Sequence, residues 1–259
     1  MKKIFYIILL TAFPFVSYAQ ENVTQTIHET ITKDVADSAY INNDFVSAIA
    51  MYETILQQDG ESANIYYNLG NSYYKMDNIA KAILNYEKAL LLNPGDGDIR
   101  FNLELAQSKT VDKVIPISEM FFVTWAKSFT NAMSENEWSK MGIIAFILSL
   151  CFLSLYFFGN KIILKKIGFI SALFLLAMCA IANVCASTQK KKIMKHEYAI
   201  IMAPSITVKS TPNDKGTDLF ILHEGHKVMI KDDTMKEWKE IQLEDGNAGW
   251  VPVELIEII

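Results

Sequence analysis

Two long apolar runs without charged residues constrain this chain more than any other feature. The 20 residues 141–160 carry no charge, and residues 167–189 carry none either. An uncharged apolar run of 18 or more residues is long enough, at about 1.5 Å per residue, to cross a hydrocarbon core of about 30 Å. A soluble helix of this length usually has a polar face. We therefore predict a transmembrane hairpin, with a first helix at 139–160, a linker at 161–166 and a second helix at 167–189.

Residues 1–19 have the features of a secretory signal peptide. Lys2 and Lys3 form a basic start, residues 4–15 form an apolar core, and the small residues Ser17 and Ala19 occupy the two positions that a signal peptidase reads. This pattern predicts cleavage before Gln20. The alternative is an uncleaved anchor, and in either case the segment that follows leaves the cytoplasm.

The signal and the hairpin together predict a topology. The hairpin returns the chain to the side on which the signal placed it, so both soluble parts are expected in the periplasm and the linker at 161–166 in the cytoplasm. The expected location is the inner membrane. A count of positive residues alone would favour the cytoplasm for Lys190–Lys195, but the signal decides the side of the first soluble part.

Charge and cysteine content exclude several functions. The net charge of −5 gives no support for nucleic-acid binding. Cys151, Cys179 and Cys185 all lie in the apolar runs. The soluble parts therefore contain no disulfide, no cysteine-rich zinc site and no cysteine nucleophile.

Residues 20–109 contain a helical repeat. One helix is predicted around residues 66–74 and a second around 79–90, with Met76-Asp77-Asn78 as the turn between them. Gly70 and Ala82 are small because the two helices cross closely there, and Pro94 ends the unit. The pattern resembles the tetratricopeptide repeat, which has a period of about 34 residues. Its signature positions are occupied by Tyr66, Leu69, Gly70, Tyr73, Ala82, Tyr86, Ala89 and Pro94.

A second copy falls one repeat period earlier. It has Asn42-Asn43-Asp44 as its turn and a degraded form of the same signature. Residues 99–109 form a third predicted helix, which covers the last apolar face as a cap or as half of a further repeat. The signature positions of the earlier copy are Val35, Ala36, Ala39, Phe45, Ala48, Tyr52, Ile55 and Gly60.

Residues 110–138 connect the repeats to the first apolar run. Their apolar residues recur at spacings of three and four, which predicts an amphipathic helix on the bilayer surface or against the repeats. Ser134 and Glu137 fit a capping box that opens the first spanning helix, with Trp138 at the membrane interface.

Residues 197–259 alternate between apolar and polar positions and contain frequent turn residues. Five or so short strands are expected, which implies a small barrel. The segment resembles the bacterial SH3-like family at Leu222-His223-Glu224-Gly225, at Trp238, and at Asp245-Gly246 followed by Gly249-Trp250-Val251-Pro252. The predicted fold class is therefore a multidomain chain of helical repeats, a two-helix transmembrane hairpin and an SH3-like β-barrel.

The order of these parts resembles the BatE family of the Bacteroidetes aerotolerance operon. That family is described as membrane-anchored repeat proteins made beside von Willebrand factor A domain membrane proteins and a MoxR-type ATPase. The resemblance implies an accessory or scaffold role with envelope proteins as partners. It supplies no reaction.

No catalytic constellation is present in the sequence. His223-Glu224-Gly225-His226 has a spacing of three rather than the four of a zincin helix, and Gly225 belongs to a turn, so a solvated hairpin turn is the expected structure. We predict no enzyme activity, no cofactor and no metal site.

Binding residues are expected on the first helix of the complete repeat, whose side chains line the concave face. Asn amides can bond a peptide backbone, and tyrosines supply rigid contact area. The alternative is that these residues only make the domain soluble. The candidates are Asn64, Tyr67, Asn68, Asn71, Tyr74 and Lys75.

The predicted function is a membrane-anchored scaffold that mediates protein–protein interactions in an envelope complex. Its expected partners are other envelope proteins, with von Willebrand factor A domain proteins as candidates, and membrane lipid. The alternative function is peptidoglycan binding through the SH3-like domain.

Overall fold

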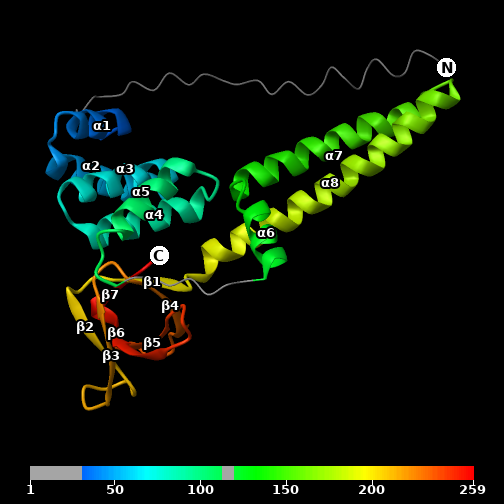
Figure 1. Cartoon of the computed structure of the whole chain (residues 1–259). Coiled ribbons are helices and arrows are strands. Elements are labelled where there is room, and N and C mark those ends of the chain that lie inside the picture. Colours follow the sequence, from blue (N-terminus) through cyan, green and yellow to red (C-terminus); the bar gives the residue numbers. More distant parts are fainter. Residues whose placement is uncertain (1–30, 113–119) are drawn as a thin grey trace. The chain divides into compact units, whose positions relative to one another are not determined.

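The computed structural model describes residues 31–112 and 120–259 of the chain. The predicted signal segment at 1–19 and residues 113–119 of the connector lie outside these ranges. Within them, a set of short helices is followed by two long apolar helices and a C-terminal antiparallel sheet (Figure 1). This order confirms the predicted fold class.

The repeat domain consists of two helix–turn–helix pairs and one further helix. Each pair matches one predicted copy of the repeat, and the last helix matches the predicted third helix. The five helices are α1 (Lys33–Ile41), α2 (Phe45–Asp59), α3 (Ala63–Lys75), α4 (Ile79–Leu92) and α5 (Gly97–Gln107).

The turns inside the two pairs are built alike, one repeat period apart. Asn43 and Asp77 adopt the left-handed conformation, with φ of 62° and 58°, which Asn and Asp tolerate better than most residues. The next residue caps the following helix: Asp44 accepts from the backbone N–H of Ser47, and Asn78 accepts in the same way from Lys81.

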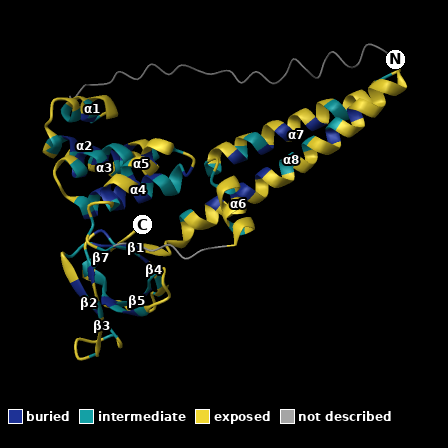
Figure 2. Cartoon of the chain, in the orientation of Figure 1, coloured by how far each residue is buried: buried dark blue, intermediate teal, exposed yellow. Residues whose placement is uncertain are grey.

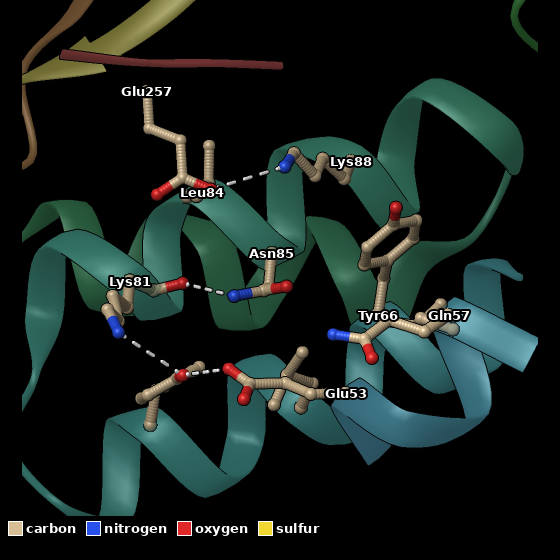
Figure 3. A pocket seen from close by; sticks show the side chains of 11 residues that line it. Glu53, Gln57, Tyr66, Lys81, Leu84, Asn85, Lys88 and Glu257 are labelled. Carbon is tan, nitrogen blue, oxygen red and sulfur yellow. Dashed lines mark hydrogen bonds and ion pairs between the residues drawn. The ribbon is translucent and has the colours of Figure 1, made fainter. Parts of the chain in front are cut away.

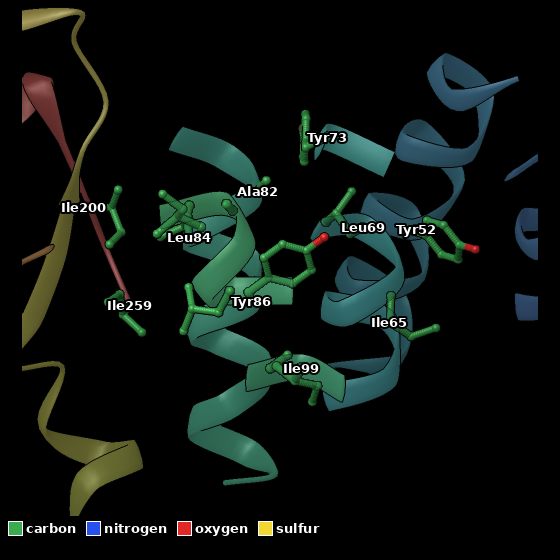
Figure 4. Packing of buried hydrophobic residues seen from close by; sticks show 14 of the residues in the cluster. Tyr52, Ile65, Leu69, Tyr73, Ala82, Leu84, Tyr86, Ile99, Ile200 and Ile259 are labelled. Carbon is green, nitrogen blue, oxygen red and sulfur yellow. The ribbon is translucent and has the colours of Figure 1, made fainter. Parts of the chain in front are cut away.

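The two helices of the second pair approach each other closely at Gly70, as predicted. A Cβ atom placed on Gly70 would lie 2.7 Å from the ring of Tyr86 and 3.3 Å from the carbonyl oxygen of Ala82. Tyr86 is 1% exposed and fills the space beside this crossing (Figure 4). A side chain larger than hydrogen at position 70 therefore has no room unless the tyrosine ring moves.

The long helices are α7 (Glu135–Phe158) and α8 (Ile162–Lys195). Both are long and apolar enough to cross a membrane, and only 17% and 22% of their most apolar windows are buried within the protein. A core helix of a soluble domain would be mostly buried, whereas most apolar side chains of α7 and α8 are exposed (Figure 2). Small residues lie at their contact, as is usual between membrane helices: Gly142, Ala145, Ser149, Gly168 and Ala172.

The bounds of these helices differ from the predicted spans. α8 begins at Ile162 and ends at Lys195, so most of the linker predicted at 161–166 is helical and the helix continues past residue 189. Lysine is a good helix former. The lysines mark the ends of the uncharged apolar run but not the ends of the helix.

Between the repeats and α7 lies α6 (Phe121–Thr130), which has no buried residue. Its last carbonyl, that of Thr130, accepts hydrogen bonds from Trp138 Nε1 at 3.0 Å and from Gln189 Nε2 at 2.8 Å. These bonds attach α6 to the start of α7 and to the last part of α8. The capping box of Ser134 and Glu137 is confirmed, while Trp138 is 3% exposed and packs against α8.

The C-terminal domain is one seven-stranded antiparallel sheet with the strand order β3-β2-β6-β5-β4-β1-β7. A short 3-10 helix, Val253–Leu255, precedes the last strand. Its strands are β1 (Tyr198–Ile201), β2 (Ser205–Lys209), β3 (Asp218–His223), β4 (Lys227–Asp232), β5 (Trp238–Gln242), β6 (Ala248–Pro252) and β7 (Ile256–Ile258).

The sheet has two strands, β1 and β7, beyond the five that alternation predicts. In β1, Ala199 and Ile201 face the core of the sheet, while Ile200 belongs to the hydrophobic core of the repeats. A strand that is buried on both faces has no polar alternation to reveal it. β7 has only three residues, too few to show a pattern. Ile259, directly after β7, also packs into the repeat core beside α4 (Figure 4).

Candidate partner-binding face of the repeats

The helices of the repeat domain are joined by a polar network that recurs with the repeat period. In the first copy, Asp37 Oδ1 accepts from Tyr52 Oη at 2.6 Å and from Asn68 Nδ2 at 2.9 Å. In the second copy, Asn71 Oδ1 accepts from Tyr86 Oη at 2.7 Å and from Asn102 Nδ2 at 3.1 Å.

Each residue of the first set is replaced in the second by the residue one repeat period later. In both sets, one oxygen on the first helix of a pair accepts two hydrogen bonds. One comes from the tyrosine of the second helix, and the other comes from the asparagine of the helix that follows the pair. The network therefore fixes the spacing of α1, α3 and α5, and it satisfies polar groups that are half-buried between helices.

The acceptor is a carboxylate in the first copy and an amide in the second. Burial raises the pKa of Asp37, but hydrogen bonds from Lys33, Tyr52 and Asn68 outweigh burial and hold that pKa below its usual value. Burial, followed by the hydrogen bond to Asp37, raises the pKa of the Tyr52 hydroxyl. Tyr52 therefore stays protonated and donates to a charged oxygen.

The structure places the six predicted site residues in two groups. Asn64 and Lys75 are exposed at the two ends of α3. Tyr67, Asn68, Asn71 and Tyr74 are half-buried and contact neighbouring helices. Asn68 and Asn71 belong to the polar network, the hydroxyl of Tyr67 accepts from Asn102 at 2.8 Å, and Lys109 Nζ lies 4.3 Å from the centre of the Tyr74 ring.

Three of these residues thus have a structural role that the sequence reading did not assign. Asn71 in particular receives the hydroxyl of a tyrosine that is 1% exposed. Asp37 and Asn102, their partners, were not among the candidates. A comparison of the sequence with itself at a shift of one repeat period pairs Asp37 with Asn71 and Asn68 with Asn102, and this is the signal that would have found them.

The turn between β3 and β4 docks on the repeat domain and is not the solvated hairpin that the sequence predicts. Asp112 Oδ2 accepts from the backbone N–H of His223 at 2.7 Å, and Asp112 Oδ1 lies 2.9 Å from His223 Nδ1. Gly225, with φ of 81°, would place a Cβ atom 2.8 Å from Thr110 and 3.0 Å from Ile83. The close approach of the repeats therefore requires glycine here.

The side chain of His226 in the same turn is 10% exposed, and its Nδ1 has no hydrogen-bond partner, the nearest charge being Asp112 Oδ2 at 3.9 Å. Burial lowers the pKa of His226, and the attraction of Asp112 opposes this only in part. Across the described ranges, no three His, Cys, Asp or Glu side chains gather in an arrangement that could hold a metal ion. His223 and His226 instead face one carboxylate.

An ion pair lies at the same contact between repeats and sheet. Lys227 Nζ is 2.6 Å from Glu87 Oε2, and Glu87 on α4 is 7% exposed. This ion pair joins a residue that precedes the hairpin to one that follows the hairpin. Ile200 and Ile259 do the same by packing into the repeat core.

The repeat domain matches a known family model. Residues 63–96 match the family model of the tetratricopeptide repeat, which covers α3, the turn, α4 and Pro94. No curated protein matches the chain. Tetratricopeptide repeats mediate protein–protein interactions and are typically non-catalytic scaffold elements, so the repeat domain indicates a protein-binding role.

Proposed function

We propose that this protein is a membrane-anchored scaffold of the BatE type, with both soluble domains in the periplasm and with its repeats bound to another envelope protein. The observation that carries the proposal is the tetratricopeptide repeat at 63–96 in a chain that also has two helices able to span a membrane. Von Willebrand factor A domain membrane proteins are the candidate partners, as the resemblance implies.

The contacts across the hairpin support the topology. Residues before α7, such as Glu87 and Asp112, contact Lys227 and His223, which follow α8. If α7 and α8 both cross the bilayer, these contacts require the repeats and the sheet to lie on the same side. The predicted signal segment supports the periplasm as that side.

The exposed part of the predicted site is the part that can meet a partner. Asn64 and Lys75 are exposed. Tyr74 is half-buried, with Lys109 over its ring, and the exposed part of the ring can contact a partner. The Tyr74 ring lies next to Lys75 in the sequence, and Asn64 adds an amide at the other end of α3. Aromatic residues are enriched at the centre of protein interfaces. Asn68 and Asn71 contribute by holding α3 between its neighbours.

The test is a triple variant that leaves the polar network intact: Asn64→Ala, Tyr74→Ala and Lys75→Ala. Tagged protein is purified from detergent-solubilised membranes of its native host, and co-purified proteins are quantified by mass spectrometry. Loss of an aromatic anchor typically costs about 2 kcal/mol or more, so recovery of the specific partner should fall about 30-fold. Gln58→Ala, an exposed change on α2, is the matched control.

Unchanged recovery from the triple variant would contradict the proposed face. If recovery were lost instead when the sheet domain after Lys195 is removed, the partner would bind the sheet.

The alternative function, peptidoglycan binding, rests on a groove in the sheet domain beside Trp238. It has a volume of about 500 Å³ and is lined by Pro212, Asn213, Asp214 and Met235–Trp238. A half-buried indole with nearby amide and carboxylate groups can stack on a sugar and bond its hydroxyls. Sedimentation with purified sacculi, comparing the native chain with Trp238→Ala, separates this function from scaffolding: only a wall-binding protein loses sedimentation in the variant.

A further inference from the structure

A cavity of about 380 Å³ lies between α2 and α4, with α3 as its floor (Figure 3). Its apolar lining is Leu56, Leu69 and Leu84, of which the last two are 3% and 2% exposed. Tyr66, Leu69 and Tyr73 line it from α3. They lie on the side of that helix opposite to Asn64, Asn68 and Asn71, because residues two apart on a helix point in nearly opposite directions.

A side-chain acceptor without a hydrogen-bond partner lines the cavity. Asn85 is 6% exposed, and its Nδ2 donates to the carbonyl oxygen of Lys81 at 2.8 Å. Its Oδ1 accepts no hydrogen bond from any described residue, and it points away from Lys81 (Figure 3). Among the described residues, His226 Nδ1 is the one side-chain nitrogen or oxygen that is fully buried and makes no hydrogen bond. Asn85 Oδ1 also accepts no hydrogen bond, so it is not fully buried. Asn85 Oδ1 is therefore open to the cavity.

The charged groups around the cavity are engaged with one another. Tyr73 Oη donates to Glu53 Oε1 at 2.5 Å and lies 3.4 Å from Lys81 Nζ. Lys88 Nζ is 3.6 Å from Glu257 on β7. Two lysines and two glutamates balance, so the cavity favours neither a cation nor an anion. A complementary ligand carries no net charge, places an apolar group against the three leucines and brings one N–H donor to Asn85.

We propose that this cavity is a second protein-binding site, which takes an aliphatic side chain from an extended segment of a partner protein. Asn85 Oδ1 accepts the backbone N–H of that segment, and Leu56, Leu69 and Leu84 surround its side chain. A backbone amide next to a leucine-like side chain supplies both features that the cavity requires. The site is independent of the face proposed above, since it occupies the opposite side of α3.

The experiment uses the full chain in detergent and a minimal probe, N-acetyl-leucine methylamide, with N-acetyl-glycine methylamide as the probe that lacks a side chain. Binding is measured by saturation-transfer NMR of the probe and by the shift of the Asn85 side-chain amide signal in protein with ¹⁵N-labelled asparagine. The leucine probe should bind saturably and shift the Asn85 signal, and the glycine probe should not.

Two variants sharpen the result. Asn85→Leu removes the acceptor but keeps the size of the side chain, and it should weaken binding of the leucine probe about five- to tenfold. Asn85→Asp keeps an acceptor oxygen and should retain binding. The triple variant of Asn64, Tyr74 and Lys75 should bind the probe as the native chain does, so that a failure of the first proposed face leaves this site unaffected.

Equal binding of both probes, or no binding of the leucine probe to the native chain, would overturn the proposal. Unchanged binding in a folded Asn85→Leu protein would overturn it as well. Far-UV circular dichroism of each variant establishes that it is folded.

Discussion

The hydrophobic cores of the repeat domain and of the C-terminal sheet are built differently. The repeats place small and aromatic residues at a fixed period, and the crossing at Gly70 and Tyr86 follows directly from it. The apolar residues of the sheet are divided between two cores. In β1, Ile201 packs in the core of the sheet and Ile200 packs in the core of the repeats. The core of the repeats can be predicted from a single sequence. The core of the sheet cannot, because β1 also packs against residues far away along the chain.

The bonds within the repeats also differ from those between the repeats and the sheet. Within the repeats, polar bonds join helices that are neighbours in the stack. At the contact with the sheet, the bonds join residues 111 and 140 positions apart, Asp112 to His223 and Glu87 to Lys227. The sheet therefore adds to the stability of the repeat domain through contacts between segments that precede α7 and segments that follow α8.

The largest expected effect tests the repeat core. Gly70→Leu should unfold the repeat domain, because even a Cβ atom there would lie 2.7 Å from the Tyr86 ring. Overpacking of a tight core costs about 1–3 kcal/mol and sometimes more. Gly97→Ala is the matched control, since nothing lies within 4 Å of its Cβ position. Thermal unfolding of the detergent-solubilised chain, followed by circular dichroism, should show a loss for Gly70→Leu alone.

The next effect tests the contact between repeats and sheet. Lys227→Ala leaves the buried carboxylate of Glu87 without its partner, which should cost about 1.5–3 kcal/mol. Lys231→Ala, on the same strand, removes an exposed pair with Glu240 at 3.9 Å and should cost less than about 1 kcal/mol. Chemical denaturation of both variants measures the difference. Equal destabilisation would mean that the contact contributes nothing beyond a surface ion pair.

The smallest expected effect is the difference in cost between matched substitutions in the two copies of the repeat. Tyr52→Phe removes a bond to a charged oxygen and should cost about 1.5–3 kcal/mol at neutral pH, whereas Tyr86→Phe removes a bond to an amide and should cost about 1 kcal/mol. The pKa of Asp37 is lower in the folded chain than its ordinary value of 3.8. Its contribution is therefore present above pH 3.8 and is lost as the pH falls below that value.

The two costs should converge in acid, because protonated Asp37 accepts no better than Asn71 does. Denaturation series that start at neutral pH and extend in steps well below pH 3.8 measure this convergence. A difference that persisted unchanged in acid would show that the charge of Asp37 plays no part.

The sequence predicted the repeat helices, their turns and the Gly70 crossing, because each depends on residues within one repeat. It did not show that Asn71 is bonded by Asn102, since that bond depends on the stacking of a third helix, although the bond from Tyr86 lies within one repeat. It missed β1, which is buried on both faces, and β7, which is too short to show alternation. It also took the His223–His226 turn as solvated, because the partner Asp112 lies on the other side of the hairpin in the sequence.

The proposed scaffold is tested most directly by measuring on which side of the membrane each part of the chain lies. An enzyme reporter that is active only in the periplasm, fused after Ile259, should be active, and the same reporter inserted between Asn160 and Lys165 should be silent. The contacts of Glu87 and Asp112 with the sheet require this pairing of the soluble domains if the hairpin spans the bilayer. A silent fusion after Ile259, or an active insertion in the hairpin, would contradict the proposed topology and with it the periplasmic scaffold.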